Sequence, residues 1–283
     1  MCGRFTLTIP SYEDLAEALG VDPAENAAAY RPRYNVAPSD TSWIFRLKGG
    51  KREILPASWG LVPWWSESKS GGQKPINARS ETLTKSRLFR DPFARKRCVV
   101  LADGFFEWRR EGAVRQPFWF RPRAGGLMLL GGIYDSFHDD ATGEHLRTFS
   151  IVTVKPNADV ADIHDRMPLV IAPADLETWV AEAPRGATDA PANVKSLLHA
   201  LPDGALSRTP VSRRVNSVAN DDPECLAPPE DEAVAVAGKA ATRAKGARAK
   251  ARAKAGAKAG AQLGLFGVSA AEEVEEARAS GRG

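Results

Sequence analysis

The chain divides near Pro228 into a part that can bury a hydrophobic core and a part that cannot. Residues 1–227 mix apolar and charged side chains, whereas residues 238–260 consist of Ala, Gly, Lys and Arg with one Thr and no acidic residue. A segment without large apolar side chains cannot offset the entropy that it loses on ordering. The composition therefore predicts one folded domain over residues 1–227 and a disordered Ala/Lys/Arg-rich tail over residues 228–283.

The basic part of this tail suits contact with nucleic acid, because Lys and Arg neutralise phosphates without reading a base sequence. The alternative is that the segment only keeps the chain soluble.

Short strand patterns outnumber helical ones within the predicted domain. Runs rich in β-branched and aromatic residues predict strands at residues 97–101, 117–121, 127–133 and 148–154. Helices are expected at residues 11–19, 81–89 and 174–181, the first of them capped by Ser11 and ended by Gly20. Strands and helices do not alternate regularly, which argues against a parallel sheet. We predict an α+β domain built on antiparallel, barrel-like sheets with flanking helices.

Cysteine and histidine usage excludes several classes of protein. The three cysteines are too widely spaced for a disulfide framework or a paired metal motif, and the four histidines show no metal-ligand spacing. The chain shows neither a secretory signal nor an apolar run of membrane-spanning length. We expect a cytoplasmic protein with reduced thiols that needs neither a metal nor another cofactor.

Cys2 follows Met1 directly and becomes the N-terminal residue if Met1 is removed. One residue would then carry both an α-amine, with a pKa near ~8, and a thiol, with a pKa near ~8.5. The amine can condense with an aldehyde to an imine, and the thiol of the same residue can close on that imine as a five-membered thiazolidine. Such a terminus suits aldehyde capture or N-terminal-nucleophile hydrolysis. The alternative for a lone Cys is a small buried residue without chemistry.

Seven short motifs place polar groups beside apolar strands or turns: MCGRF at 1–5, RYNVAP at 33–38, WGLVPWW at 59–65, INARSET at 76–82, ADGFFEW at 102–108, IHDRMP at 163–168 and PVSRRVN at 210–216. In this order and spacing, the chain resembles the SRAP family of abasic-site processing proteins, formerly called SOS response-associated peptidases. The resemblance covers residues 1–227 and leaves the tail outside. It implies covalent capture of abasic sites in single-stranded DNA, which shields the lesion during replication and the DNA damage response.

The resemblance also implies the roles of four site residues. The Cys2 amine would attack the sugar aldehyde and its thiol would close the thiazolidine. Glu107 would assist ring opening and proton transfer, and its aromatic neighbours in the sequence favour a raised pKa. Asn77 would hydrogen-bond the substrate or the terminus, and His164 would manage the imine and hydroxyl protons.

DNA contact would fall to a further set of residues. By resemblance, four arginines face the phosphate backbone, two tryptophans wedge or stack against bases, and a proline and a methionine line the same region. These residues are Arg4, Arg79, Arg87, Arg166, Trp64, Trp65, Pro38 and Met167. The alternative for the tryptophan pair is a place in the core, since adjacent strand residues point to opposite faces. We expect the binding to be largely independent of sequence.

Two other functions stay open at this point. The same Cys2, Glu107 and His164 could serve a thiol peptidase or autopeptidase of the N-terminal-nucleophile type. The domain could also be a non-covalent single-strand binding module. We expect a monomer located at the nucleoid, with single-stranded DNA as its partner.

A second partner is suggested by the only apolar cluster after the basic arm. Gln262, Leu263, Leu265 and Phe266 match the bacterial sliding-clamp pentapeptide Gln-Leu-x-Leu-Phe at its four specified positions. Leu265 and Phe266 would fill an apolar pocket and Leu263 would pack beside them. Gln262 would add a directional hydrogen bond. The alternative is a chance apolar patch in an unstructured end, because a five-residue pattern is weak by itself.

Overall fold

The computed structural model describes residues 2–23, 27–67, 72–112, 114–139, 142–184 and 186–230. The first compact unit of the chain ends at Pro229, two residues beyond the predicted boundary. The predicted disordered tail and its clamp-docking peptide lie outside the described residues. No helix in the part of the chain that is described has the length and apolarity needed to cross a membrane.

Five strands close into a barrel in the order β10-β4-β3-β6-β9, because β9 pairs back onto β10. They are β3 (Thr41–Lys48), β4 (Lys51–Trp59), β6 (Arg97–Ala102), β9 (Met128–His138) and β10 (His145–Val154). The pairing is antiparallel except between β4 and β10, which run parallel. Two short strands extend from β10: β5 (Asn77–Arg79) pairs with it in parallel and β11 (Met167–Pro168) antiparallel. Closure leaves few unpaired edges and encloses an apolar interior that includes Phe45 and Phe149.

The second sheet has the order β12-β8-β7-β1-β2. Its strands are β1 (Phe5–Leu7), β2 (Arg33–Val36), β7 (Gly104–Glu111), β8 (Val114–Pro122) and β12 (Leu206–Pro210). The chain passes from the barrel into this sheet at Asp103, whose carboxylate accepts hydrogen bonds from the Thr6 hydroxyl and the Thr8 backbone N–H. Gly104 is needed at this crossing, since a Cβ there would lie 2.2 Å from Trp119 Nε1. The predicted α+β architecture on barrel-like sheets is confirmed.

The first predicted helix is confirmed as α1 (Tyr12–Leu19). The Ser11 side chain accepts the backbone N–H of Asp14, and Gly20 ends the helix with φ 61°. The helix expected near residue 176 is present as α3 (Leu176–Val180), which follows a 3-10 turn at Pro173–Asp175. The remaining short elements are α4 (Ala192–Lys195) and the 3-10 turns Ala27–Ala29, Arg213–Asn216 and Pro223–Leu226.

The helix predicted over residues 81–89 is wrong. A 3-10 turn spans Ser80–Thr82, and α2 (Arg90–Arg95) begins only after the predicted range. Hydroxyl side chains explain the difference, because Thr82 bonds back to the Arg79 carbonyl and Ser86 accepts the Leu88 N–H. Such local bonds compete with a helical ladder.

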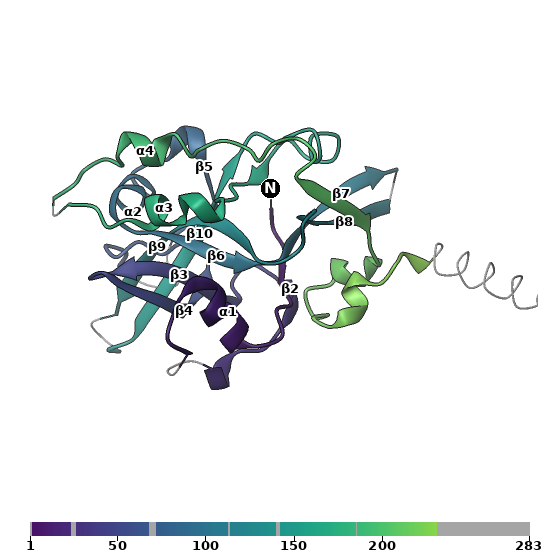
Figure 1. The fold of residues 1–283 in the computed structure, drawn as a ribbon, viewed down its shortest axis with the longest axis horizontal. Helices are drawn as coiled ribbons and strands as arrows, with labels where there is room; N and C mark the ends of the chain where they lie inside the picture. The colour runs from purple at the N-terminus through teal and green to yellow at the C-terminus, as the bar shows by residue number, and fades with distance from the viewer. Residues whose placement is uncertain are drawn as a thin grey trace, which may run out of the picture. The chain divides into compact units, whose positions relative to one another are not determined.

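The start of the chain lies between the two sheets (Figure 1). Phe5 on β1 packs against Trp59 at the end of β4, with ring centroids 5.1 Å apart, and Trp59 stacks on Phe149 of β10. The Trp59 indole N–H donates to the Ile76 carbonyl just before β5 (2.8 Å). These contacts bring the N-terminal segment next to β5 and β7, which carry two of the predicted catalytic residues, Asn77 and Glu107.

Candidate active site

Cys2 is fully buried in the segment that leads into β1, three residues before Phe5. The Asn77 amide on β5 donates to the Cys2 carbonyl oxygen at 2.8 Å. On the other side, β1 pairs with β7 through Phe5 opposite Phe105, and the Phe106 N–H donates to the Arg4 carbonyl. Continuing this register by two residues places Gly3 opposite Glu107. The chain start is therefore held between a strand of the barrel and a strand of the second sheet.

The Cys2 thiol lies in a dry environment. Burial raises the pKa of Cys2 far above its usual range, and the negative charge of Glu107 raises it further. The sulfur lies 3.8 Å from the Arg4 carbonyl oxygen, a weak acceptor contact that suits a protonated thiol. The thiol therefore keeps its proton at neutral pH until a neighbouring group accepts it.

Glu107 is the group best placed to handle that proton. Its side chain is 3% exposed on β7, and burial raises its pKa to about 7, with a further upward contribution from Asp165. The raised pKa expected from its aromatic neighbours is confirmed, although burial in the folded chain is the main cause. A carboxyl group with this pKa is present in both protonation states at neutral pH, as general acid–base chemistry requires.

His164 follows a turn after β10 and lines the same cleft as Glu107. The backbone N–H of Arg166 donates to its Nδ1 at 3.0 Å, and Asp165 Oδ1 lies 3.1 Å from the same nitrogen. Burial lowers the pKa of His164, while Asp165 opposes this effect. The Arg166 carbonyl oxygen also lies 3.2 Å from Nδ1, so this nitrogen has a partner in either neutral tautomer.

The Asn77 side chain has one hydrogen-bond acceptor, Oδ1, that no described residue uses. Its Oδ1 is buried and has no hydrogen-bond partner among the residues that the structure describes, while its amide nitrogen binds the Cys2 carbonyl. A buried acceptor without a donor is costly, typically ~1–3 kcal/mol. A substrate hydroxyl or the Cys2 amine could donate to this oxygen. The structure therefore brings the four predicted catalytic residues, Cys2, Asn77, Glu107 and His164, to one place.

A cleft of about 1030 Å³ opens over this cluster. Two of its walls come from the chain start and from β7, and a third comes from the segment before His164. Its lining residues are Gly3, Arg4, Ala37, Pro38, Asp40, Glu107, Trp108, Arg109, Arg110, Arg115, Asp162, Ile163, His164, Asn216 and Val218. Within the described part of the chain, no three His, Cys, Asp or Glu side chains gather in a way that could hold a metal ion.

The predicted DNA-contact residues fall into two groups. Arg4 and Pro38 line the cleft, and Arg79 lines a second cleft of about 610 Å³ beside Lys155. Trp64 and Trp65 are 57% and 42% exposed in a turn after β4, so the alternative that they form a core pair is wrong. The Arg87 guanidinium lies 4.8 Å from the Trp65 ring centroid, which holds that arginine at the surface.

Arg166 and Met167 are buried side chains, although Arg166 lines the second cleft together with Arg79. The Arg166 guanidinium bonds to both Glu81 oxygens at 2.7 and 2.9 Å and to the Thr153 carbonyl at 2.7 Å. Met167 is fully buried in β11, and its sulfur accepts the Asn157 N–H. The buried Thr153 carbonyl and the half-exposed Glu81 carboxylate hold the guanidinium, and the pairing of β11 with β10 places Met167 in the interior. Both residues anchor the segment that carries His164 to the body of the domain.

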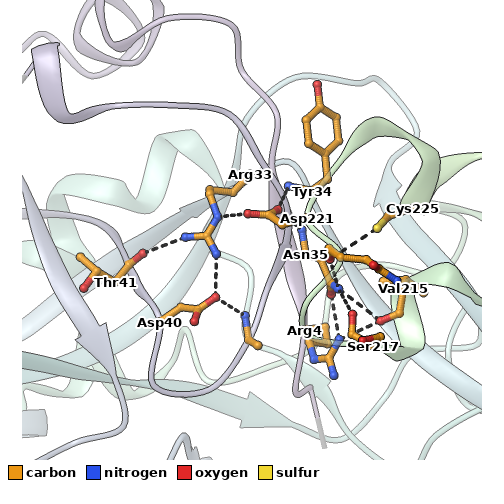
Figure 2. A network of polar contacts seen from close by, with 12 residues as sticks. Arg4, Arg33, Tyr34, Asn35, Asp40, Thr41, Val215, Ser217, Asp221 and Cys225 are labelled. Atoms are coloured by element: carbon orange, nitrogen blue, oxygen red, sulfur yellow. Dashed lines mark hydrogen bonds and ion pairs between the residues drawn. The ribbon is translucent and has the colours of Figure 1, made fainter.

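A polar network secures the chain start from its other side (Figure 2). Arg4 Nη1 donates to the Asn35 side chain at 2.9 Å and to the Val215 carbonyl at 2.8 Å. The Asp221 carboxylate accepts the backbone N–H groups of Tyr34 and Asn35. The motif at residues 210–216 therefore anchors Arg4 and β2. Both bonds use Arg4 Nη1, so this nitrogen is not available to a ligand.

Sequence reasoning missed the arginines of the β7–β8 hairpin. Arg109, Arg110 and Arg115 line the cleft on the side of Glu107. The signal was present in the run EWRREGAVR, which places three basic residues directly after the predicted acid–base carboxylate. Asn216 was also missed, and its side chain accepts the Trp108 indole N–H at 2.7 Å.

Comparison with solved structures agrees with this architecture. A protein from Bacteroides thetaiotaomicron matches with a TM-score of 0.70 at 24% identity, over 80% of this chain and 99% of that one. A phage-related protein from Bordetella bronchiseptica matches with a TM-score of 0.55 at 26% identity, over 75% of this chain and 95% of that one. The fold is thus a known one, and these chains fit it over nearly their full length.

Family and sequence comparisons define the class. The family model described as SOS response associated peptidase (SRAP) matches residues 1–218, so the chain belongs to the SRAP family. Abasic site processing protein YoqW of Bacillus subtilis is 35% identical over 80% of this chain and 99% of its own length. Abasic site processing protein YedK of Escherichia coli is 32% identical over 81% of this chain and its full length. Abasic site processing protein HMCES of Gallus gallus is 32% identical over 71% of this chain and 67% of its own.

Proposed function

We propose that this protein captures abasic sites in single-stranded DNA as a covalent thiazolidine on Cys2. The observation that carries the proposal is the burial of Cys2 between the Asn77 amide and Glu107, whose pKa is about 7. The relatives that cover this domain are named abasic site processing proteins, which supports the same substrate. Met1 must first be removed, because only then does Cys2 carry an α-amine.

The chemistry follows as a condensation and then an addition. An abasic deoxyribose exposes an aldehyde at C1′ when its ring opens, and protonated Glu107 can assist that opening at the ring oxygen. The Cys2 amine then attacks C1′, and loss of water leaves a C=N bond. Finally the Cys2 sulfur bonds to C1′ while its proton passes to the nitrogen, which closes the ring. Ring closure removes the imine that would otherwise promote strand cleavage by elimination.

The surrounding residues supply orientation and proton transfer. Asn77 holds the Cys2 carbonyl and offers Oδ1 to the amine or to a sugar hydroxyl. His164 lines the cleft, and its depressed pKa favours the neutral imidazole. With its proton on Nδ1, toward the Arg166 carbonyl and Asp165, its Nε2 can accept a proton during imine formation.

Intact mass spectrometry tests the proposal. The purified protein should lack Met1 and should gain the mass of an abasic oligonucleotide minus one water, in a product that survives denaturation. An undamaged oligonucleotide of the same sequence should add no mass. A complex that disappears on denaturation would instead support a non-covalent single-strand binding module.

A thiol peptidase of the N-terminal-nucleophile type is the alternative, and the family description names that activity. A thiol peptidase needs a ready thiolate, whereas burial keeps the Cys2 thiol protonated. Cleavage of a peptide substrate without DNA linkage would favour the peptidase.

We further propose that the enzyme works at the nucleoid as a monomer and docks on the replicative sliding clamp. Gln262, Leu263, Leu265 and Phe266 would occupy the clamp pocket, and the basic arm would add attraction for DNA close to the same site. Micromolar affinity is the scale expected for a short peptide that orders on binding. A labelled peptide spanning residues 261–268 should bind purified clamp saturably, and replacement of both Leu265 and Phe266 by Ala should abolish binding. Light scattering of the full chain reports the oligomeric state.

A further inference from the structure

The outer part of the β7–β8 hairpin carries a basic surface that begins at the catalytic cluster. Glu107 lies inside the cleft, and the next residues along β7 lead outward to the exposed Arg110. Arg110 is paired in register with Arg115 on β8, and Arg115 is also exposed. Residues directly opposite each other on two strands share one face of a sheet. Two guanidinium groups therefore stand side by side on the wall of the cleft.

Trp108 lies on the same face of the hairpin and is contacted by two guanidinium groups. Its position is two residues before Arg110, so it shares the same face, and its indole N–H is fixed by Asn216 at 2.7 Å. The Arg115 guanidinium lies 6.0 Å from the Trp108 ring centroid, and Arg4 lies 5.9 Å from it. A guanidinium held against an aromatic ring keeps its N–H donors available at the rim. Arg4 also uses a donor for internal bonds, whereas Arg115 extends from the surface.

Like charges opposite each other on a sheet destabilise the pair unless an anion lies between or beside them. The repulsion between Arg110 and Arg115 is therefore better explained by a ligand than by folding. The ligand must be negatively charged and able to extend from the cleft along a strand pair. A phosphodiester backbone has this form, because it repeats one negative charge at each nucleotide.

We propose that Arg110 and Arg115, the second of which lies over the Trp108 ring, bind the phosphates of undamaged nucleotides on one side of the reacting sugar. This surface, the hairpin rail, consists of Trp108, Arg110, Arg115 and Asn216. The inference rests on the proposed function, and it adds a one-sided requirement for flanking single-stranded DNA. The contacts are to the backbone, so the rail accepts any base sequence.

The chain offers a matched control on the same strand. Arg121 of β8 is also exposed and lies over a tryptophan, 5.0 Å from the ring centroid of Trp119, but it does not line the cleft. Replacement of Arg121 by Ala removes one positive charge, as each single substitution in the rail does, and the same kind of cation–π contact as Arg115→Ala. A specific effect of the rail should therefore be absent from Arg121→Ala.

Binding is measured by fluorescence anisotropy with oligonucleotides that carry a tetrahydrofuran abasic analogue, which has no aldehyde and cannot react. The double variant Arg110→Ala/Arg115→Ala should bind roughly tenfold more weakly. The negative slope of log K against log salt concentration should become shallower by about 1.4, or ~0.7 for each phosphate that the variant no longer neutralises. Shortening the oligonucleotide on one side of the lesion should weaken wild-type binding but leave the double variant unchanged. Arg121→Ala should match the wild type.

The proposal would be overturned if the wild type and the double variant bound with equal affinity and equal salt slopes. It would also be overturned if Arg121→Ala lost as much affinity as the double variant. Equal sensitivity to shortening on both sides would also overturn it. Adduct formation with true abasic DNA at saturating concentration separates this outcome from failure of the proposed function. Arg121→Ala should reach the wild-type adduct yield there, whereas a wild type that forms no adduct refutes the capture chemistry and leaves the binding comparison intact.

Discussion

Glu81 and Arg166 form a two-pronged ion pair, with N–O distances of 2.7 and 2.9 Å, behind the loop that carries His164. The pair joins the INARSET and IHDRMP motifs, which lie more than eighty residues apart in the sequence. The backbone N–H of the same Arg166 binds His164 Nδ1. Glu81 therefore acts on the imidazole through Arg166 and does not itself line the cleft that contains Glu107.

We predict that Glu81→Ala slows adduct formation roughly tenfold while DNA binding changes little, because the His164 ring loses its fixed orientation. Rates are measured by denaturing gel at saturating abasic DNA, and binding with a non-reactive analogue. Glu177→Ala is the control, since it removes a more exposed ion pair with Arg52. Unchanged adduct kinetics in Glu81→Ala would show that Arg166 holds the loop without help.

The same pair should contribute to stability in a defined pH range. Hydrogen bonds from Arg166 lower the pKa of Glu81 to about 2, so its contribution is present above pH ~4.5 and is lost as the pH falls toward 2. Glu81 is half exposed, and solvent screening limits the effect on Tm to about 2 °C. The Tm difference between wild type and Glu81→Gln should therefore shrink between pH 4.5 and pH 2. If this Tm difference stays constant between pH 4.5 and pH 2, it arises from side-chain packing and not from the charge of Glu81.

Glu107→Gln should slow adduct formation by about 10²-fold, because it removes a proton carrier and keeps the shape of the side chain. Burial raises the folded-state pKa to about 7, so the wild type loses stability as the pH rises from ~4.5 to 7. Glu107→Gln has no carboxyl group to titrate, so its stability should fall less than that of the wild type between pH ~4.5 and 7. Thermal unfolding at pH 5 and pH 8 checks this second expectation, and identical pH dependence in both proteins would contradict the buried-carboxyl assignment.

Cys2→Ala should abolish the heat-stable adduct, since the alanine amine can form only a reversible imine. Cys2→Ser should give at most a slower or less stable product, because a hydroxyl is a poor nucleophile at neutral pH. Borohydride reduction should trap the imine in Cys2→Ala and recover a covalent product. A wild-type amount of heat-stable adduct from Cys2→Ala without reduction would rule out the thiazolidine.

Gly104→Ala should destabilise the domain by about 2–3 kcal/mol, because the new methyl group would meet the Trp119 indole at 2.2 Å and the Phe120 carbonyl at 2.8 Å. Urea unfolding measures the loss. Gly125→Ala is less crowded, since nothing lies within 4 Å of the site of its Cβ, although its φ of 74° adds some strain. A smaller loss at Gly104 than at Gly125 would mean that the crossing between the sheets adapts easily.

Local sequence patterns were sufficient for the regular elements that depend on near neighbours. Ser11 and Gly20 bound α1 as predicted, because capping needs only bonds within one turn. The strands at residues 97–101 and 148–154 were found from their apolar runs. The helix expected at residues 81–89 failed because the apolar pattern does not describe the local bonds of the Thr82 and Ser86 side chains, which compete with a helix. Leu83 and Phe89 are in addition buried in the core.

The sequence by itself determined which residues carry chemistry: an amine and a thiol at Cys2, a carboxyl at Glu107 and an imidazole at His164. Only the tertiary structure decided their protonation and their partners. The pKa of Glu107 depends on burial between sheets, and the inward turn of Arg166 depends on a carboxylate far away in the chain. Desolvation and charge pairing act through space over a few ångströms, so they are set by contacts that form only when distant segments pack together.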